Sequence, residues 1–130
     1  MADAILVTDD IDSGRLLLQE LDKAEFPYRA AAWVYNPDTE RWKLVIATPE
    51  ADVDLQKALM AVLNAIKAGP VALNDFDLAR VRLVSPDFFH FKKPGQVALS
   101  TEQAPIRYSG YTMNGVYIYD SLIYKLAEIG

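Results

Sequence analysis

The sequence has no cysteine and only one histidine, His90, among its 130 residues. The absence of thiols excludes disulfides, thiolate nucleophiles and cysteine-ligated zinc or iron–sulfur centres. A single imidazole excludes a histidine-rich metal centre. The chain also lacks the P-loop, the G-x-G-x-x-G fingerprint and the G-x-S-x-G nucleophile elbow. We therefore expect no metal and no cofactor, and no motif identifies a catalytic residue.

Long apolar runs and a basic leader are missing as well. No stretch reaches the roughly 20 apolar residues that span a bilayer, and the first residues carry no basic region of the kind found in signal peptides. Acidic residues outnumber basic ones by 18 to 13, which gives a net charge of -5. That charge opposes binding to nucleic acid and to anionic membranes. The expected protein is cytoplasmic, with neither of these as a partner.

Apolar residues, in contrast, are plentiful, since 52% of the sequence is hydrophobic. A chain of this length and composition can bury a core without covalent cross-links, and it has the usual size of one domain. No internal repeat or low-complexity tract divides it. We predict a single domain over residues 1–130.

The clearest local signal lies near the C-terminus, where Asn114 and Gly115 separate two tyrosine-rich apolar runs. Both residues readily adopt positive φ, as a two-residue type I′ turn requires. The pattern predicts an antiparallel ribbon formed by Ile106–Met113 and Val116–Leu126. It also places Gly110 opposite Tyr119, whose ring would shield a glycine in the strand.

An amphipathic helix is expected near the N-terminus, after a short apolar segment that is either an edge strand or a disordered start. Pro27 ends the helix, because the residue before a proline is pushed out of the α region. Three acids offer N-caps and favourable charge at its start: Asp9, Asp10 and Asp12. The apolar stripe repeats at helical spacing and consists of Leu17, Leu18, Leu21 and Ala24.

Two strands, 28–35 and 41–47, follow as a hairpin with a longer loop. The sequence leaves their register open, and a slip of one residue exchanges the two faces. A four-residue loop pairs Trp33 with Trp42. A five-residue loop instead gives a cleaner apolar face, made of Ala32, Val34, Trp42, Leu44 and Ile46.

The best helix start in the chain is Thr48, Pro49 and Glu50, which combine an N-cap, a proline at N1 and an acid in the first turn. The apolar stripe predicted to face the sheet consists of Leu55, Leu59, Val62 and Ile66. A strand over residues 78–84 comes next. The order of elements predicts an α+β fold, an antiparallel β-sheet of about five strands with two amphipathic helices packed on one face (α-β-β-α-β-β-β).

Residues 4–24 resemble the start of a response-regulator receiver domain. In that family an acidic pair after the first strand binds magnesium, and Asp9 and Asp10 follow a short apolar run in the same way. Lys93-Pro94 is similar to the late Lys-Pro of the family. The sequence departs where the phospho-acceptor aspartate belongs, because Ala47 and Thr48 stand there. Capping of the N-terminal helix is the alternative role of the two aspartates.

An aromatic segment, in which Phe88, Phe89 and Phe91 surround His90, precedes two lysines. One interpretation is a loop anchored by buried phenylalanines, and the other is a surface for a partner or ligand. Aromatic and cationic side chains together can also stack on single-stranded nucleic acid, which the acidic net charge disfavours.

The ribbon register brings polar side chains together on one face: Arg107, Ser109, Tyr111 and Asp120. Arg107 and Asp120 become diagonal neighbours within reach of an ion pair. This cluster is either a structural ion pair or a ligand-binding site. The opposite face carries apolar and aromatic residues: Ile106, Tyr108, Tyr117, Tyr119 and Ile123.

Both faces of the ribbon carry apolar residues, so both faces should be shielded from water. If the two helices pack on one side of the sheet, the other face is left for a partner. We therefore expect an interaction or accessory module without catalytic chemistry that self-associates as a homodimer through its sheet surface. A different protein is the alternative partner. The expected partner residues are Tyr117, Tyr119, Phe88, Phe89 and Phe91.

Two alternative functions stay open. One is a small-molecule binder or small enzyme that uses Arg107, Asp120 and nearby tyrosines, and the other is a degenerate receiver-like domain. The run from Arg107 to Leu126 is also similar to stretches of small bacterial proteins, a resemblance that implies no activity.

Overall fold

The computed structural model of the chain describes residues 6–86, 105–113 and 116–126, apart from the side chains at positions 111, 113, 116 and 126. The helices are α1 (Thr8–Lys23), the single turn α2 (Glu50–Val53) and α3 (Leu55–Ala68). The described strands form one sheet in the order β3-β2-β1-β5-β4, with the bounds β1 (Ala30–Asn36), β2 (Arg41–Ala47), β3 (Val81–Val84), β4 (Ile106–Met113) and β5 (Val116–Leu126).

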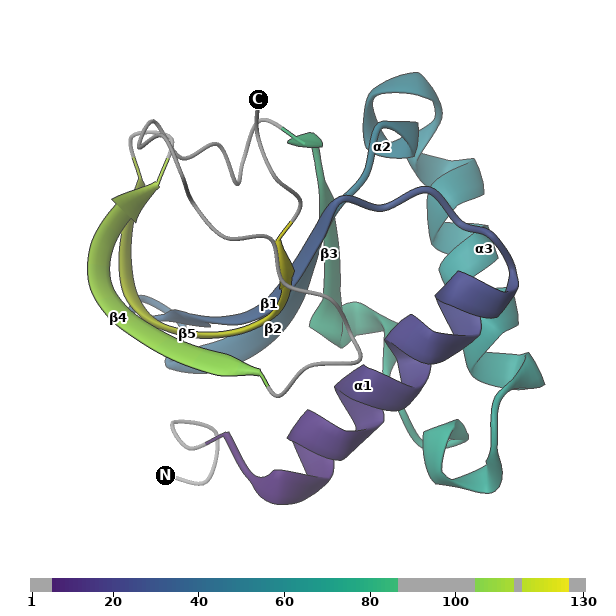
Figure 1. The fold of residues 1–130 in the computed structure, drawn as a ribbon, viewed down its shortest axis with the longest axis horizontal. Helices are drawn as coiled ribbons and strands as arrows, with labels where there is room; N and C mark the ends of the chain where they lie inside the picture. The colour runs from purple at the N-terminus through teal and green to yellow at the C-terminus, as the bar shows by residue number, and fades with distance from the viewer. Residues whose placement is uncertain (1–5, 87–104, 114–115, 127–130) are drawn as a thin grey trace.

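The predicted α+β class is confirmed. The two long helices, α1 and α3, lie on one side of the sheet, and the β4–β5 ribbon curves away from them (Figure 1). One strand pair departs from the expected antiparallel arrangement, because β3 runs parallel to β2 with Leu44 paired to Val81. The chain between these strands contains α3, and a crossover of this kind returns the chain in the same direction.

The hairpin has a register that differs from both alternatives read from the sequence. Asn36 pairs with Arg41, so residues 37–40 form the loop, and Trp33 lies opposite Leu44 rather than Trp42. Trp33 and Trp42 nevertheless share the face that turns toward the helices, where both are buried. Ala32 belongs to the opposite face, which overturns the five-residue loop.

Helix α1 begins before the predicted caps and ends before Pro27. Val7 occupies the N-cap, so Asp9 and Asp10 lie in the first turn, where the helix dipole favours acids, and are not caps. At the other end Glu25 adopts φ 57°. The amide of Phe26 then donates to the carbonyl of Leu21 at 2.9 Å, which is the hydrogen bond of a left-handed helix end.

The predicted second helix is broken at Asp54. The chain makes one turn as α2, and the Asp54 carboxylate then caps α3 by accepting from the Lys57 amide at 3.1 Å. Of the predicted stripe, Val62 and Ile66 are buried and Leu59 is half-buried, whereas Leu55, the first residue of α3, is 47% exposed. The prediction that Leu55 faces the sheet is therefore wrong. The side chains of α3 that are buried are Ala58, Val62, Ala65 and Ile66.

The strand predicted over 78–84 is shorter than expected, because its first three residues form a 3₁₀ turn, Leu78–Arg80. Asp77 initiates this turn by accepting from the Ala79 amide at 2.9 Å. Only Val81–Val84 then joins the sheet as β3.

The larger core cluster lies between the sheet and the helices, and a smaller cluster occupies the other face. The smaller cluster consists of Ala30, Ala32, Val45, Ala47, Ile118 and Ile123, all of which are buried. The sequence suggested that a partner must cover this second face. Because these six residues are already buried, a partner is not needed across the whole of it. Among the described sheet residues, the exposed large apolar side chains belong to the β4–β5 ribbon: Ile106, Tyr108, Tyr117 and Tyr119.

Candidate functional site

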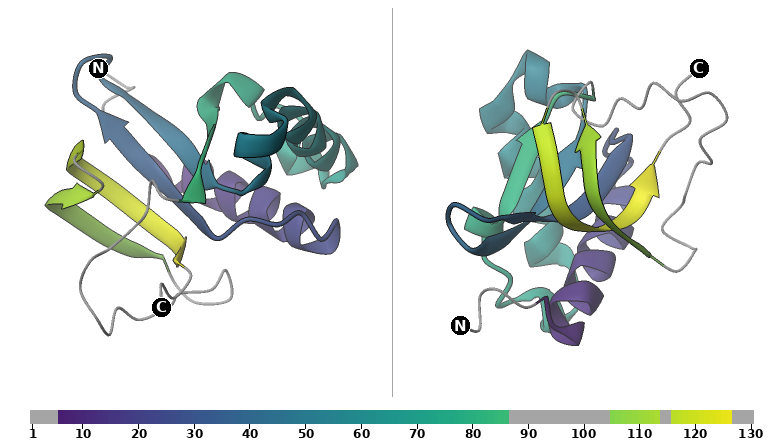
Figure 2. Two further views of the ribbon diagram at one scale, coloured as in Figure 1. Left: turned by 90° about the horizontal axis from the view of Figure 1, so that it is seen from above. Right: turned by 90° about the vertical axis from the view of Figure 1, so that its left-hand side faces the viewer.

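The candidate site is the β4–β5 ribbon, which extends beyond the area that the helices cover (Figure 2). Ser109 pairs with Asp120, and Met113 pairs with Val116, so the predicted ribbon and its register are confirmed. The turn residues Asn114 and Gly115 lie outside the described residues. Because side chains alternate along each strand, this register gives the ribbon one polar face and one aromatic face.

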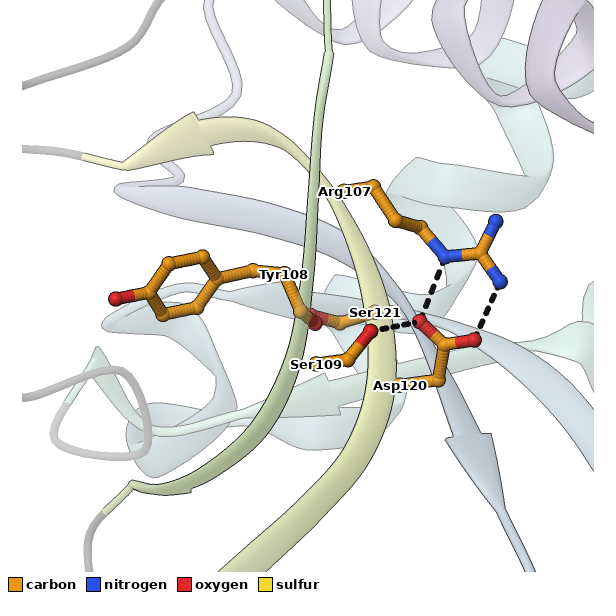
Figure 3. A network of polar contacts seen from close by, with 5 residues as sticks. All are labelled: Arg107, Tyr108, Ser109, Asp120 and Ser121. Carbon is orange, nitrogen blue, oxygen red and sulfur yellow. Dashed lines mark hydrogen bonds and ion pairs between the residues drawn. The ribbon is translucent and has the colours of Figure 1, made fainter.

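The polar face carries the predicted ion pair. The guanidinium Nε of Arg107 donates to Oδ1 of Asp120 at 2.6 Å, and its Nη2 donates to Oδ2 (Figure 3). The Ser109 hydroxyl also donates to Oδ1, at 2.7 Å. Three of the four residues proposed for this cluster are thus in contact, and the side chain of the fourth, Tyr111, is not described.

The electrostatic interaction within this pair favours the ionised forms of both Arg107 and Asp120. The hydrogen bond from Arg107 is the main cause that lowers the pKa of Asp120, with a further contribution from Ser109, while partial burial acts in the opposite direction. The same hydrogen bond raises the pKa of Arg107. A general acid or base needs a pKa near the working pH. The pKa of Asp120 is lowered and that of Arg107 is raised, so both move away from neutral pH. The pair is therefore suited to holding the strands together.

Arg107 also connects the ribbon to the rest of the sheet. Its guanidinium carbon lies 5.3 Å from the centre of the Trp42 ring, a cation–π contact. The Trp42 ring is itself packed on Tyr35, with 5.5 Å between ring centres. The contact between Arg107 and Trp42 had no signal in the sequence, because β2 and β4 are not neighbours in the sheet. The sheet's curvature and a long arginine side chain bring the two together.

The aromatic face points the other way, as the ring of Tyr108 shows in Figure 3. Tyr117 and Tyr119 are 53% and 55% exposed, and their rings meet edge to face with 4.8 Å between centres. Gly110 adopts φ +67°. The nearest group to its missing Cβ is the hydroxyl of Tyr117, at 3.4 Å, so the tyrosine over this glycine is Tyr117 and not the predicted Tyr119.

The acidic pair near the N-terminus does not form a receiver-type site. Asp10 makes an ion pair with Arg80 at 2.7 Å, and the Arg80 guanidinium lies 4.7 Å from the centre of the Trp33 ring. Receiver domains have a parallel, doubly wound sheet, whereas four of the five strands here are joined by antiparallel pairs. The receiver-like alternative is therefore incorrect.

The remaining predicted partner residues, Phe88, Phe89 and Phe91, lie outside the described residues, as do His90 and Lys93-Pro94. Over the described ranges, no group of three or more acidic or histidine side chains is placed to hold a metal ion. None of the helices in these ranges has the length and apolar character needed to cross a bilayer.

Comparisons with known proteins found no match to a protein-family model, to a curated protein or to a solved structure. The candidate site is therefore defined by its own geometry.

Proposed function

We propose that the protein is an interaction module that forms a homodimer through the aromatic face of its β4–β5 ribbon. We define this aromatic face by Ile106, Tyr108, Tyr117 and Tyr119. The observation that carries the proposal is that these four side chains, each 46–55% exposed, share one face of a two-stranded ribbon. Clustered apolar exposure of this kind is typical of protein–protein contact surfaces.

Side-chain chemistry supports the same role. Tyrosine offers a large, rigid contact area with a polar tip and is enriched at interfaces. When a surface pairs with the same surface of a second copy about a twofold axis, both copies of the surface are covered and no further copy can add to them. Such twofold dimers are the commonest assemblies. A homodimer is therefore the simplest way to cover the aromatic face.

The polar face contributes by keeping the ribbon in one shape. The bidentate Arg107–Asp120 pair and the Arg107–Trp42 contact tie β4 to β5 and to β2. A surface that is already ordered loses less entropy when it associates. In this proposal the ion pair positions the aromatic face.

The position of β4 adds a second route of contact. Among the described strands β4 lies at one edge of the sheet, and an edge strand has backbone groups that can pair with another chain. Antiparallel pairing of β4 with its own copy would be twofold-symmetric, as an isologous dimer requires.

The test is the molar mass in solution, measured by light scattering and sedimentation velocity at micromolar concentrations. The wild-type protein should be a dimer. Tyr117→Glu and Tyr119→Glu should each shift it toward the monomer, with the far-ultraviolet circular dichroism spectrum retained. Val71→Glu is the matched control, because Val71 is 83% exposed and lies outside the ribbon. A wild-type protein that stays monomeric over the accessible range, or equal dissociation by the control, would reject the proposal.

The alternative of a small-molecule or enzymatic site on Arg107, Ser109 and Asp120 has less support. Both carboxylate oxygens and two of the guanidinium nitrogens already bond to each other. The pair therefore offers a ligand only the guanidinium N–H groups and the carboxylate lone pairs that these bonds leave over.

A further inference from the structure

A groove of ≈ 580 Å³ lies near the tip of the β1–β2 hairpin and the start of β5. Figure 2 (left) shows these two parts of the sheet at the end of the molecule far from the helices. Two side chains of the smaller core cluster, Val45 and Ile118, line it together with Val34, which packs against that cluster. Residues 36–39 and the Tyr117–Tyr119 pair line it as well. The volume falls within the range of roughly 300–1,000 Å³ that small-molecule sites occupy.

The sheet register places two cations on the groove side. Lys43 pairs with Val34, and Arg82 pairs with Val45, so both point to the same side of the sheet as these two valines. The Lys43 ammonium donates to the carbonyl of Ala79 at 3.0 Å, a neutral partner that leaves its charge uncompensated.

The described residues that line the groove include more basic than acidic side chains, in a chain that is acidic overall. Among the described residues that line it, the charged ones are Lys43, Arg82 and Asp38, so two positive charges and one negative give +1. The chain as a whole carries -5. A locally positive groove with an apolar lining is suited to a ligand that combines an anionic group with an apolar body.

The aromatic side chains that line the groove indicate the shape of the ligand's apolar part. Tyr117 and Tyr119 present two rings at right angles, at 85° to each other, and both rings are more than half exposed. A flat ring can pack on one of them and meet the edge of the other, which are the two preferred aromatic geometries.

We propose that this groove binds a small aromatic monocarboxylate. The ring would lie against Tyr117, Tyr119 and the apolar lining, and the carboxylate would face Lys43 and Arg82. Charge-assisted hydrogen bonds from lysine and arginine to a carboxylate are stronger than neutral ones. This inference goes beyond self-association. The ligand ring and the partner copy would compete for Tyr117 and Tyr119, whereas Lys43 and Arg82 are not part of the aromatic face and give ligand binding a separate readout.

The experiment is a nuclear magnetic resonance titration of the full chain with 2-naphthoate as the probe, and with 2-naphthamide as a neutral probe of the same shape. Naphthoate should shift the backbone amide signals of Val34, Val45 and Tyr119. It should bind roughly tenfold more tightly than the amide, which is the difference that one charge-assisted hydrogen bond supplies.

Two variants test the cations. Lys43→Gln and Arg82→Gln change exposed side chains and should each weaken naphthoate binding by roughly tenfold, as expected for loss of one charged partner. Binding of naphthamide should stay the same. Lys57→Gln, an exposed lysine on α3, is the matched control and should leave both affinities unchanged. The molar mass of every variant is measured in the same samples, so that a change in assembly is separated from a change in ligand binding.

Three results would overturn the inference. The first is that naphthoate leaves the groove amides unshifted at millimolar concentration. The second is that acid and amide bind equally well. The third is that Lys57→Gln weakens naphthoate as much as Lys43→Gln does, because binding would then follow overall charge and not the groove.

Discussion

Gly14 of α1 lies directly against the hydroxyl group of Tyr124 on β5. A Cβ atom at Gly14 would come within 2.6 Å of this oxygen and within 2.8 Å of Nε1 of Trp33. Because that atom is missing, α1 approaches the sheet closely enough for Tyr124 to donate to the carbonyl of Ile11 while it accepts from Trp33 at 2.9 Å. Burial is the main cause that raises the pKa of Tyr124, so the hydroxyl keeps the proton it donates.

Gly14→Ala should therefore destabilise the fold, although alanine is the better helix former. The helix gain is about 1 kcal/mol, and overpacking a dense contact costs about 1–3 kcal/mol. We expect a net loss in the free energy of unfolding, measured by urea denaturation. Tyr124→Phe removes the oxygen that a Cβ would meet, so Gly14→Ala should cost less in that background by at least about 0.5 kcal/mol. Strictly additive effects would contradict this contact.

The α3 stripe predicts unequal effects for similar side chains. Ile66 is 4% exposed, and Ile66→Ala should cost about 2–5 kcal/mol because it leaves a cavity in the core. Leu55→Ala, on the exposed side of the same helix, should change stability by less than about 0.5 kcal/mol. Leu59→Ala should fall between the two, since Leu59 is half-buried. Equal losses for Ile66 and Leu55 in denaturant melts would show that α3 packs through a face other than the one described.

The ion pair predicts a pH dependence of defined sign. The pKa of Asp120 is lower in the folded protein than its ordinary value, which is about 3.9 in an unfolded chain. The pair therefore stabilises the fold above that ordinary value, and the contribution disappears as the pH falls through the lower folded pKa. Since Arg107 is 57% exposed, the contribution should stay below about 1 kcal/mol.

The measurement is a titration of the Asp120 carboxyl carbon signal. Arg107→Gln should raise the pKa of Asp120 toward its ordinary value. Arg41→Gln removes an exposed arginine at the start of β2 and should leave the Asp120 titration unchanged. An Asp120 pKa that is the same with and without Arg107 would show that the pair is not formed in solution.

Glu25 offers a substitution that should stabilise the protein. Its φ of 57° lies in the left-handed region, which costs a residue with a Cβ about 1 kcal/mol or more and glycine almost nothing. Glu25→Gly should therefore raise the free energy of unfolding by up to about 1 kcal/mol in urea denaturation. Glu20→Gly, in the interior of the same helix, should lower it by a similar amount. A loss of stability in both variants would mean that the helix end differs from the one described.

Local chemistry determined the C-terminal ribbon. A two-residue turn at Asn114 and Gly115 leaves one register, and the alternation of side chains then puts Arg107 and Asp120 on the same face. The ion pair could be predicted for this reason before any distance was known. The same holds for most of the α1 stripe, since Leu17, Leu18 and Leu21 are buried, whereas Ala24 is the exposed C-cap residue and was wrongly included.

Contacts between distant segments decided the rest. The parallel pairing of β3 with β2, the contact of Arg107 with Trp42 and the exposure of Leu55 all depend on how the elements pack together. Propensity and periodicity act over a few residues and carry no information on which strands distant in the sequence become neighbours or how a sheet curves. The sequence alone therefore determined the approximate positions of the long helices and of the strands, the ribbon register and one ion pair. Only the tertiary structure decided where α3 and β3 begin and which apolar side chains stay exposed, because burial is a property of the packed chain.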